Sequence, residues 1–195
     1  MNGSEVEKTG GRPETLLLTV VPGAIARFFP LFLEGVALET ETGKTVREFL
    51  CAVLGVDEAY VEGRISTIFL NGRPVDDLDA AIVDDGSVLA LSAAMPGLVG
   101  AAMRRGGYYA AMRSGISHLP GEGHSGARRG RIRLKLFNMI LEEIAPSLLR
   151  AGVIVGAEGL SRVIAGLDRD GLIEPGAGSK ISSKTRIVVV SRNGP

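Results

Sequence analysis

The chain has 195 residues, of which 45% are hydrophobic, a mean hydropathy of +0.23 and a formal net charge of zero at pH 7. This composition supports a sizeable buried core and excludes a globally disordered chain. No apolar run reaches the roughly 18–20 residues of a membrane span, because Glu142 and Glu143 interrupt the best candidate. A single cysteine, Cys51, excludes an internal disulfide framework, and the polar start lacks a signal-peptide core. We therefore expect a soluble, cytoplasmic protein.

The charges are divided unequally between the two halves. Residues 1–97 carry 7 Lys/Arg and 15 Asp/Glu, a net of −8, and residues 98–195 carry 15 and 7, a net of +8. This asymmetry favours two units with different surfaces. The basic half could meet nucleic acid, acidic protein or a membrane surface. Alternatively, the two halves attract one another, within a chain or head to tail between chains. We expect a homo-oligomer and no membrane partner.

Two strands and an aromatic segment are predicted near the N-terminus, after a flexible tail at residues 1–14. The apolar run Leu16–Val21 ends at a Pro-Gly pair, as a buried strand does. Residues 36–41 alternate between apolar and polar types, the pattern of a half-exposed strand. Between them, AIARFFPLFL contains Phe28, Phe29 and Phe32. We expect this segment to extend the first hairpin or to form an apolar bulge on its edge.

Residues 45–55 carry a complete set of helix signals. Thr45 and Glu48 have the spacing of a capping box. Apolar residues at 46, 49, 50, 53 and 54 form one stripe for packing on a sheet. Gly55 stands where a left-handed C-cap belongs.

The stretch at residues 65–91 predicts two further strands. Ile65–Leu70 runs into an Asn71-Gly72 turn, and Ser87–Leu91 follows a second turn. The resulting order is β-β-α-β-β, with a last strand that can enter between its predecessors. This is the layout of a β-grasp fold, which we assign to residues 15–97.

The second half predicts a linker and a small lobe. Residues 98–131 are rich in Gly, Arg and Ala and predict a linker with one short helical piece. Helical stripes follow at 137–148, where Pro146 should kink the helix or begin a new one, and at 160–167. Residues 185–191 predict a closing strand. The fold class is therefore α+β, with a basic, helix-rich lobe at 132–195 that ends in a strand.

Catalytic signals are nearly absent. His118 and His124 lie in the glycine-rich linker, and further His, Cys or clustered carboxylates are too few for a metal site. Cys51 lies off the helical stripe, with no histidine near it in the sequence. We expect no catalytic residues, no metal, no cofactor and no enzymatic activity.

The segments TVREFL, IFLNGRPV and DDGSVLAL together resemble the small sulfur-carrier proteins of thiamine and molybdopterin biosynthesis. These are ubiquitin-like β-grasp proteins of the ThiS/MoaD type, and the resemblance covers about residues 15–97. It implies a non-catalytic carrier whose partner is a ubiquitin-activating-like adenylyltransferase. In that family the partner adenylates a C-terminal Gly-Gly, which is then converted to a thiocarboxylate.

Two positions are candidates for such a tail. The family's tail position corresponds to residues 94–97, where Gly97 is the one glycine. Further on, Arg-Arg-Gly106-Gly107 looks like a ubiquitin tail inside the chain, and cleavage after Gly107 would expose a carrier-type terminus. The alternative is that Gly106-Gly107 is a turn between two Ala-Met-Arg segments.

A second resemblance concerns residues 160–191, which are similar to the recognition helix and wing of bacterial winged-helix regulators. It implies that Arg162 lies on an exposed helix face and that Lys180, Lys184 and Arg186 lie near a wing, where they could contact phosphates. A purely structural lobe would explain the same residues.

The leading interpretation is a non-catalytic, sulfur-carrier-like protein that acts through protein contacts. The expected docking surfaces are its sheet face, the segment around Phe28, Phe29 and Phe32, and the acidic first half. One alternative is a latent sulfur carrier activated by cleavage after Gly107. The other is a winged-helix-like nucleic-acid binder with a β-grasp sensor or dimerisation domain.

Overall fold

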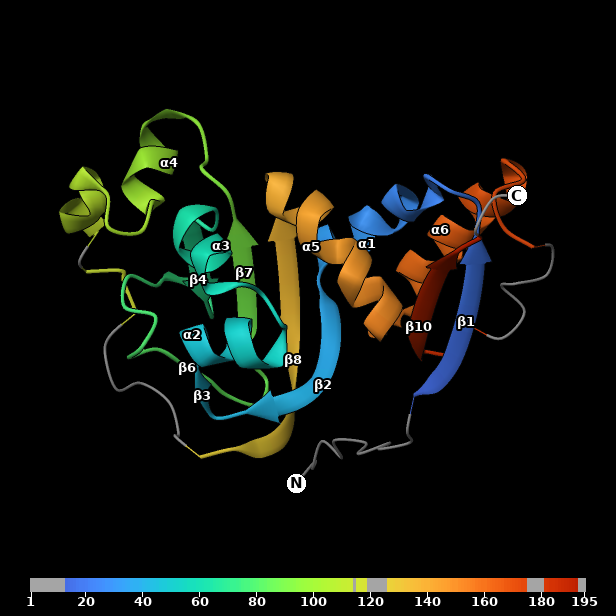
Figure 1. Ribbon diagram of the computed structural model, residues 1–195, viewed down its shortest axis with the longest axis horizontal. Helices are drawn as coiled ribbons and strands as arrows, with labels where there is room; N and C mark the ends of the chain where they lie inside the picture. The colour runs from blue at the N-terminus through green and yellow to red at the C-terminus, as the bar shows by residue number, and fades with distance from the viewer. Residues whose placement is uncertain (1–12, 114, 119–125, 175–180, 193–195) are drawn as a thin grey trace, which may run out of the picture.

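The computed structural model describes residues 13–113, 115–118, 126–174 and 181–192. This part of the chain is a mixed α/β structure built on one large mixed sheet (Figure 1). The strands are β1 (Glu14–Val20), β2 (Val36–Thr42), β3 (Lys44–Thr45), β4 (Thr67–Leu70), β5 (Arg73–Pro74), β6 (Ile82–Val83), β7 (Val88–Ser92), β8 (Arg128–Phe137), β9 (Val153–Gly156) and β10 (Lys184–Ser191). The helices are η1 (Ala24–Phe28), α1 (Phe29–Glu34), α2 (Val46–Glu48), η2 (Phe49–Val53), α3 (Glu58–Gly63), α4 (Gly97–Met103), η3 (Tyr108–Arg113), α5 (Asn138–Ala151) and α6 (Ala157–Arg169).

The large sheet has eight strands in the order β1-β10-β9-β2-β8-β7-β4-β5. The pairs β1–β10 and β7–β8 are parallel, and the other neighbours are antiparallel. Strands β3 and β6 form a separate two-stranded ladder. Strand β8 is central, because it joins β2 from the first part of the sequence to β7.

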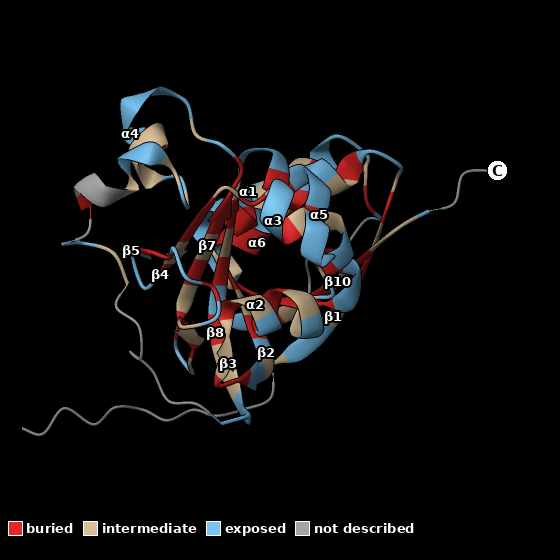
Figure 2. Ribbon diagram, turned by 60° about the vertical axis from the view of Figure 1, so that its left-hand side comes forward, coloured by how far each residue is buried: buried red, intermediate tan, exposed pale blue. Residues whose placement is uncertain are grey.

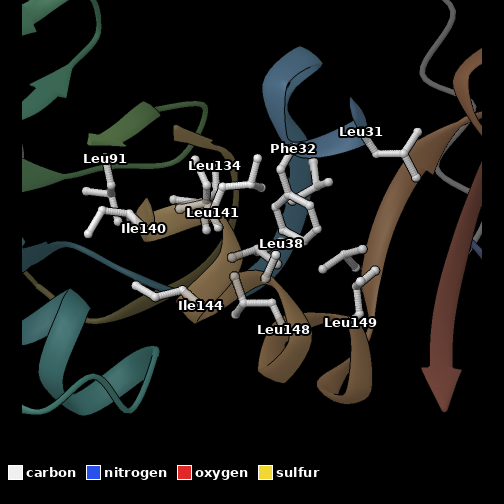
Figure 3. Close-up of a cluster of buried hydrophobic side chains, with 14 of the residues drawn as sticks. Leu31, Phe32, Leu38, Leu91, Leu134, Ile140, Leu141, Ile144, Leu148 and Leu149 are labelled. Atoms are coloured by element: carbon white, nitrogen blue, oxygen red, sulfur yellow. The ribbon is translucent and has the colours of Figure 1, made fainter. Parts of the chain in front are cut away.

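The core lies between this sheet and a single layer of helices. Alternate residues of the strands point towards the helices and are buried, as Leu38, Leu91 and Leu134 are. Figure 3 shows Leu91 beside Ile140 of α5, Leu134 beside Leu141 of α5, and Leu38 near Phe32 of α1 and Leu148 of α5. In Figures 1 and 2 the helices α1, α2, α3, α5 and α6 lie on the same side of the sheet. The segment containing α4 and η3 stands apart from that layer, beyond the end of β7.

Several local predictions are confirmed. Thr45 and Glu48 form both hydrogen bonds of the capping box. The helix then widens into a π-turn over η2, in which the Leu54 N–H donates to the Phe49 carbonyl. Asn71 (φ 52°) and Gly72 (φ 79°) are both in the left-handed region, as the predicted tight turn requires.

The predicted pairing of the N-terminal strand is wrong. Residues 14–20 do form a strand, but it is the edge strand β1, and it pairs with β10 rather than with β2. The place beside β2 is taken by β8, with Leu38 opposite Ile132. The last strand of residues 65–91 was predicted to enter between strands that precede it, but β7 lies between β4 and β8, and β8 follows it in the chain.

The aromatic segment is helical and belongs to the core. Residues 24–34 form η1 and α1, not a hairpin extension or an edge bulge. Phe28 and Phe32 are fully buried, and Phe29 is half-buried. The prediction that this segment is an exposed docking surface is therefore wrong for Phe28 and Phe32, because both side chains belong to the buried core.

The predicted boundaries do not separate independent parts. Residues 128–131 were assigned to a linker but begin β8, which hydrogen-bonds to β2 and β7 of the preceding unit. The short helical piece expected within 98–131 corresponds to α4 and η3. Pro146 does not divide its helix, since α5 runs from Asn138 to Ala151 with Pro146 inside it.

Candidate functional site

The face of the sheet opposite the helices carries exposed and half-buried side chains from most of the strands. Its side chains are the alternate residues of each strand that point away from the core, as the strand registers give them. We call this surface the open face. Its exposed or half-buried members are Thr15, Leu17, Thr19, Ala37, Glu39, Glu41, Phe69, Val88, Ala90, Arg129, Arg131, Arg133, Lys135, Phe137, Arg186, Val188 and Val190. Their neighbours in each strand are largely buried.

A row of cations runs along the middle of the open face. It consists of Arg129, Arg131, Arg133 and Lys135, at every second position of β8. Successive members are about 6.6 Å apart along the strand. Of the intervening residues of β8, Ile132 and Leu134 are buried in the core and Gly130 is half-buried. The row therefore results from a strict alternation of basic and apolar residues in one long strand.

The lower half of the row, Arg129 and Arg131, faces acids on β2. Glu39 accepts hydrogen bonds from Arg131 (2.5 Å) and from Arg186 of β10 (2.9 Å). The hydrogen bond from Arg131 lowers the pKa of the Glu39 carboxyl below its ordinary value of 4.5, although burial acts in the opposite direction. Glu41 lies opposite Arg129 in the register and forms an ion pair with Lys44.

The upper half of the row consists of Arg133 and Lys135. The residues beside them on β2 and β7 are small or apolar, and none is acidic. Arg133 lies between Ala37 of β2 and Val88 of β7 in the registers. Lys135 lies opposite Ala90. A Cβ atom on Gly35 would lie only 2.8 Å from Cγ and Cδ of Arg133 and 3.3 Å from Cε of Lys135. The backbone at Gly35 therefore leaves room for the stems of both side chains.

An open depression of about 1280 Å³ lies at the lower end of the open face. Its lining includes Arg129, Arg131, Arg186, Glu39 and Glu41. Because most of these charges compensate one another, the depression offers less free positive charge than the upper half of the row.

The glycines predicted as a carrier tail lie in a folded segment. Gly106 (φ 62°) and Gly107 form a turn between α4 and η3, in which the Gly107 N–H donates to the Arg104 carbonyl (3.2 Å). Gly97 (φ 80°) opens α4. The three glycines line a shallow hollow of about 570 Å³. The structure thus brings the tail candidates together, but within the chain and in a turn conformation.

The nucleic-acid candidates are not brought together. Arg162 lies on α6 and is engaged by Glu34 (2.5 Å) and Glu158 (2.8 Å). Lys184 begins β10 and Arg186 lies within it on the open face, while Lys180 is outside the described residues. Of the segment predicted as a wing, residues 175–180 are outside the described part of the chain, and Lys184–Ser191 form β10, an internal strand between β1 and β9.

Groups with catalytic potential are sparse in the described residues. No cluster of three or more His, Cys, Asp or Glu in this part of the chain could hold a metal ion. Burial raises the pKa of the Cys51 thiol, which makes the thiolate scarcer at neutral pH. His124 is outside the described residues, and the His118 N–H donates to the Pro74 carbonyl. None of the described helices is long and apolar enough to cross a membrane.

Arg186 is among the residues predicted from the sequence, but the row of cations on β8 is not. The signal was present, because RRGRIRLKLF alternates basic and apolar residues from Arg129 to Leu136. The glycine-rich composition just upstream led to a linker boundary at residue 131, in the middle of the strand.

Comparison with known proteins gives no assignment: no family model, no curated protein and no solved structure matches this chain.

Proposed function

We propose that this protein is a non-catalytic, sulfur-carrier-like β-grasp protein that acts by binding another protein through its open face. The observation that carries the proposal is the one-sided covering of the sheet. All the helices of the core layer pack on one face, and the other face presents side chains from most of the strands. A broad accessible sheet face with mixed apolar and charged side chains has the composition of a protein interface.

The order of strands supports the β-grasp part of the proposal. Strands β2, β8, β7, β4 and β5 are consecutive in the sheet, and the helical segment from Val46 to Val53 packs on it. Strand β7 enters between β8 and β4, as the last strand of a β-grasp sheet enters between its predecessors. In this assignment β8 fills the position that an N-terminal strand would occupy.

We infer the class of partner from the resemblance to sulfur carriers. In those proteins the exposed sheet binds a ubiquitin-activating-like adenylyltransferase. Docking of that kind requires the sheet face but no free tail, so it is compatible with a Gly106-Gly107 turn inside the chain. The proposal is therefore of binding, without transfer of sulfur by this chain.

The latent-carrier alternative is less well supported. Cleavage after Gly107 would place β8 on the downstream fragment, although β8 lies between β2 and β7. Release of a carrier would then require the removal of a ten-residue strand from the middle of the sheet. The cost of exposing its buried residues, among them Ile132, Leu134 and Leu136, disfavours that step.

Site-specific photo-crosslinking in the protein's own cells tests the proposal. A photoreactive amino acid at Ala37 samples the open face, and one at Glu142, an exposed residue of α5, samples the helical side. We expect a discrete adduct with a ubiquitin-activating-like adenylyltransferase from position 37 and none from position 142. The absence of that adduct from position 37, or equal adducts from both positions, would contradict the proposal.

A further inference from the structure

We propose that the upper half of the cation row, Arg133 and Lys135, binds an acidic, extended segment of the partner protein. This inference rests on the proposed function, because it specifies the chemistry of the partner that docks on the open face. It concerns the part of the face where positive charge is not compensated.

Arg133 and Lys135 are the members of the row that have no acid opposite them in the strand registers, whereas Arg129 lies opposite Glu41 and Arg131 opposite Glu39. Arg131 and Arg186 share Glu39, and Arg128 is paired with Asp84 at 2.7 Å. Within the described part of the chain, Arg133 and Lys135 form no ion pair. A cation without an internal partner keeps its charge available for a ligand, and the sheet surface beside it reduces the competition from water.

The neighbours of this pair suit a flat, closely approaching ligand. Gly35, Ala37, Val88 and Ala90 lie beside Arg133 and Lys135 in the adjacent strands. Small side chains at these positions leave the two charged groups as the most prominent features of the local surface. Another polypeptide can therefore approach the sheet closely over this area.

The spacing of the two cations matches an extended peptide. Residues at i and i+2 of a strand lie on one face, about 6.6 Å apart. An extended segment that runs along β8 with Asp or Glu at every second position would place one carboxylate near Arg133 and the next near Lys135. The planar guanidinium of Arg133 could then hold its carboxylate in a bidentate manner.

Single-stranded nucleic acid fits this surface less well. Such ligands are held by aromatic side chains on which the bases stack, in addition to basic residues. Among the described residues of the open face the aromatic side chains are Phe69 in β4 and Phe137 at the end of β8, and both are half-buried rather than exposed. The exposed rings of Tyr108 and Tyr109 belong to η3, outside the sheet. The charge is present, but a stacking platform is not.

The test uses the full-length protein and a fluorescein-labelled decaglutamate peptide, with binding followed by fluorescence anisotropy at several salt concentrations. We expect saturable binding that weakens as salt rises. The double variant R133Q/K135Q should weaken it by about tenfold. The control R150Q/R169Q removes the same charge from exposed positions on α5 and α6 and should bind like the wild type.

Three results would overturn the proposal. One is no binding of the peptide by the wild type, and another is equal weakening in the two double variants, which would indicate net charge alone. The third is tighter binding of a fluorescent oligothymidylate, lost in R133Q/K135Q, which would assign the row to nucleic acid. Photo-crosslinking from Ala37 separates these failures from failure of the docking proposal, because an adduct that persists in R133Q/K135Q leaves docking intact and removes only the acidic segment.

Discussion

The guanidinium of Arg113 lies 2.7 and 2.9 Å from the two carboxylate oxygens of Asp76, and the Arg113 side chain is only 3% exposed. The same guanidinium donates to the carbonyl oxygens of Ala102 (2.6 Å) and Arg104 (3.4 Å). One side chain thus ties η3 to α4 and ties both to the loop that follows β5. The turn at Gly106-Gly107 lies between the two helices that these contacts join.

Replacing Arg113 with Met should loosen this segment while leaving the sheet folded. The substitution leaves two carbonyl oxygens without this donor and Asp76 without its partner, at a cost of about 1–3 kcal/mol. We expect faster amide hydrogen exchange over residues 97–113 and unchanged exchange in β7 and β8, measured by mass spectrometry. The control is Arg104→Met in the same segment, where the side chain is exposed. Equal exchange in the two variants would show that the Arg113 contacts do not hold the segment.

Cutting the chain after Gly107 should not separate its halves. Strand β8 keeps its hydrogen bonds to β2 and β7 whether or not the connection is intact. With a specific protease site inserted after Gly107, we expect the two fragments to co-elute in size-exclusion chromatography and to separate in denaturant. A folded fragment 1–107 that elutes alone would contradict this and would support the latent-carrier alternative.

Phe32→Ala should destabilise the protein by about 3–5 kcal/mol, because it removes a fully buried ring and leaves a cavity between α1 and the sheet. The same change at the half-buried Phe29 should cost clearly less. Urea denaturation followed by circular dichroism measures both. A small loss for Phe32→Ala would be inconsistent with its place in the core.

The unfolding free energy of the protein should fall at acid pH in part because Glu39 becomes protonated. Its folded-state pKa is held below 4.5 by Arg131, so its contribution is fully present above the unfolded pKa and is lost as the pH falls through the folded pKa. We expect Glu39→Gln to make the fall of the unfolding free energy between about pH 5 and pH 3 shallower than in the wild type. Glu142→Gln, at an exposed site on α5, should leave that slope unchanged. A wild-type slope in Glu39→Gln would refute the role of this ion-pair cluster.

Features that depend on a few neighbouring residues could be predicted from the sequence. The capping box at Thr45 and Glu48 and the turn at Asn71-Gly72 are of this kind, because each is determined by hydrogen bonds or φ angles within about four residues. The strand predicted at residues 36–41 from local alternation is β2, and the strand predicted at residues 87–91 from the turn before it is β7.

Strand pairing could not be predicted in the same way. A period of two identifies which residues of a strand face the core, but it does not identify the neighbouring strand. β1 and β10 are separated by more than 160 residues, yet Leu17 lies opposite Val188. The open face depends on such pairings, so it became visible only in the structure, whereas the cation row has a signal in the alternation of β8 alone.

The helical aromatic segment had a usable signal that was misinterpreted. Ala24, Phe28, Leu31 and Phe32 stand at i, i+4, i+7 and i+8 and are all buried. The expectation of a hairpin extension or apolar bulge used the number of phenylalanines and not their helical spacing. The helical period predicts one buried face, and with it the burial of Phe28 and Phe32.

The position of β8 also has a consequence for how the protein is made. During synthesis the chain is complete as far as β7 well before residues 128–137 leave the ribosome, so the nascent sheet lacks its middle strand for that interval. The edges of β2 and β7, including the apolar surface that Leu134 later covers, are then open to other strands. The sheet of the first half can be completed only after β8 has been synthesised and has paired with β2 and β7.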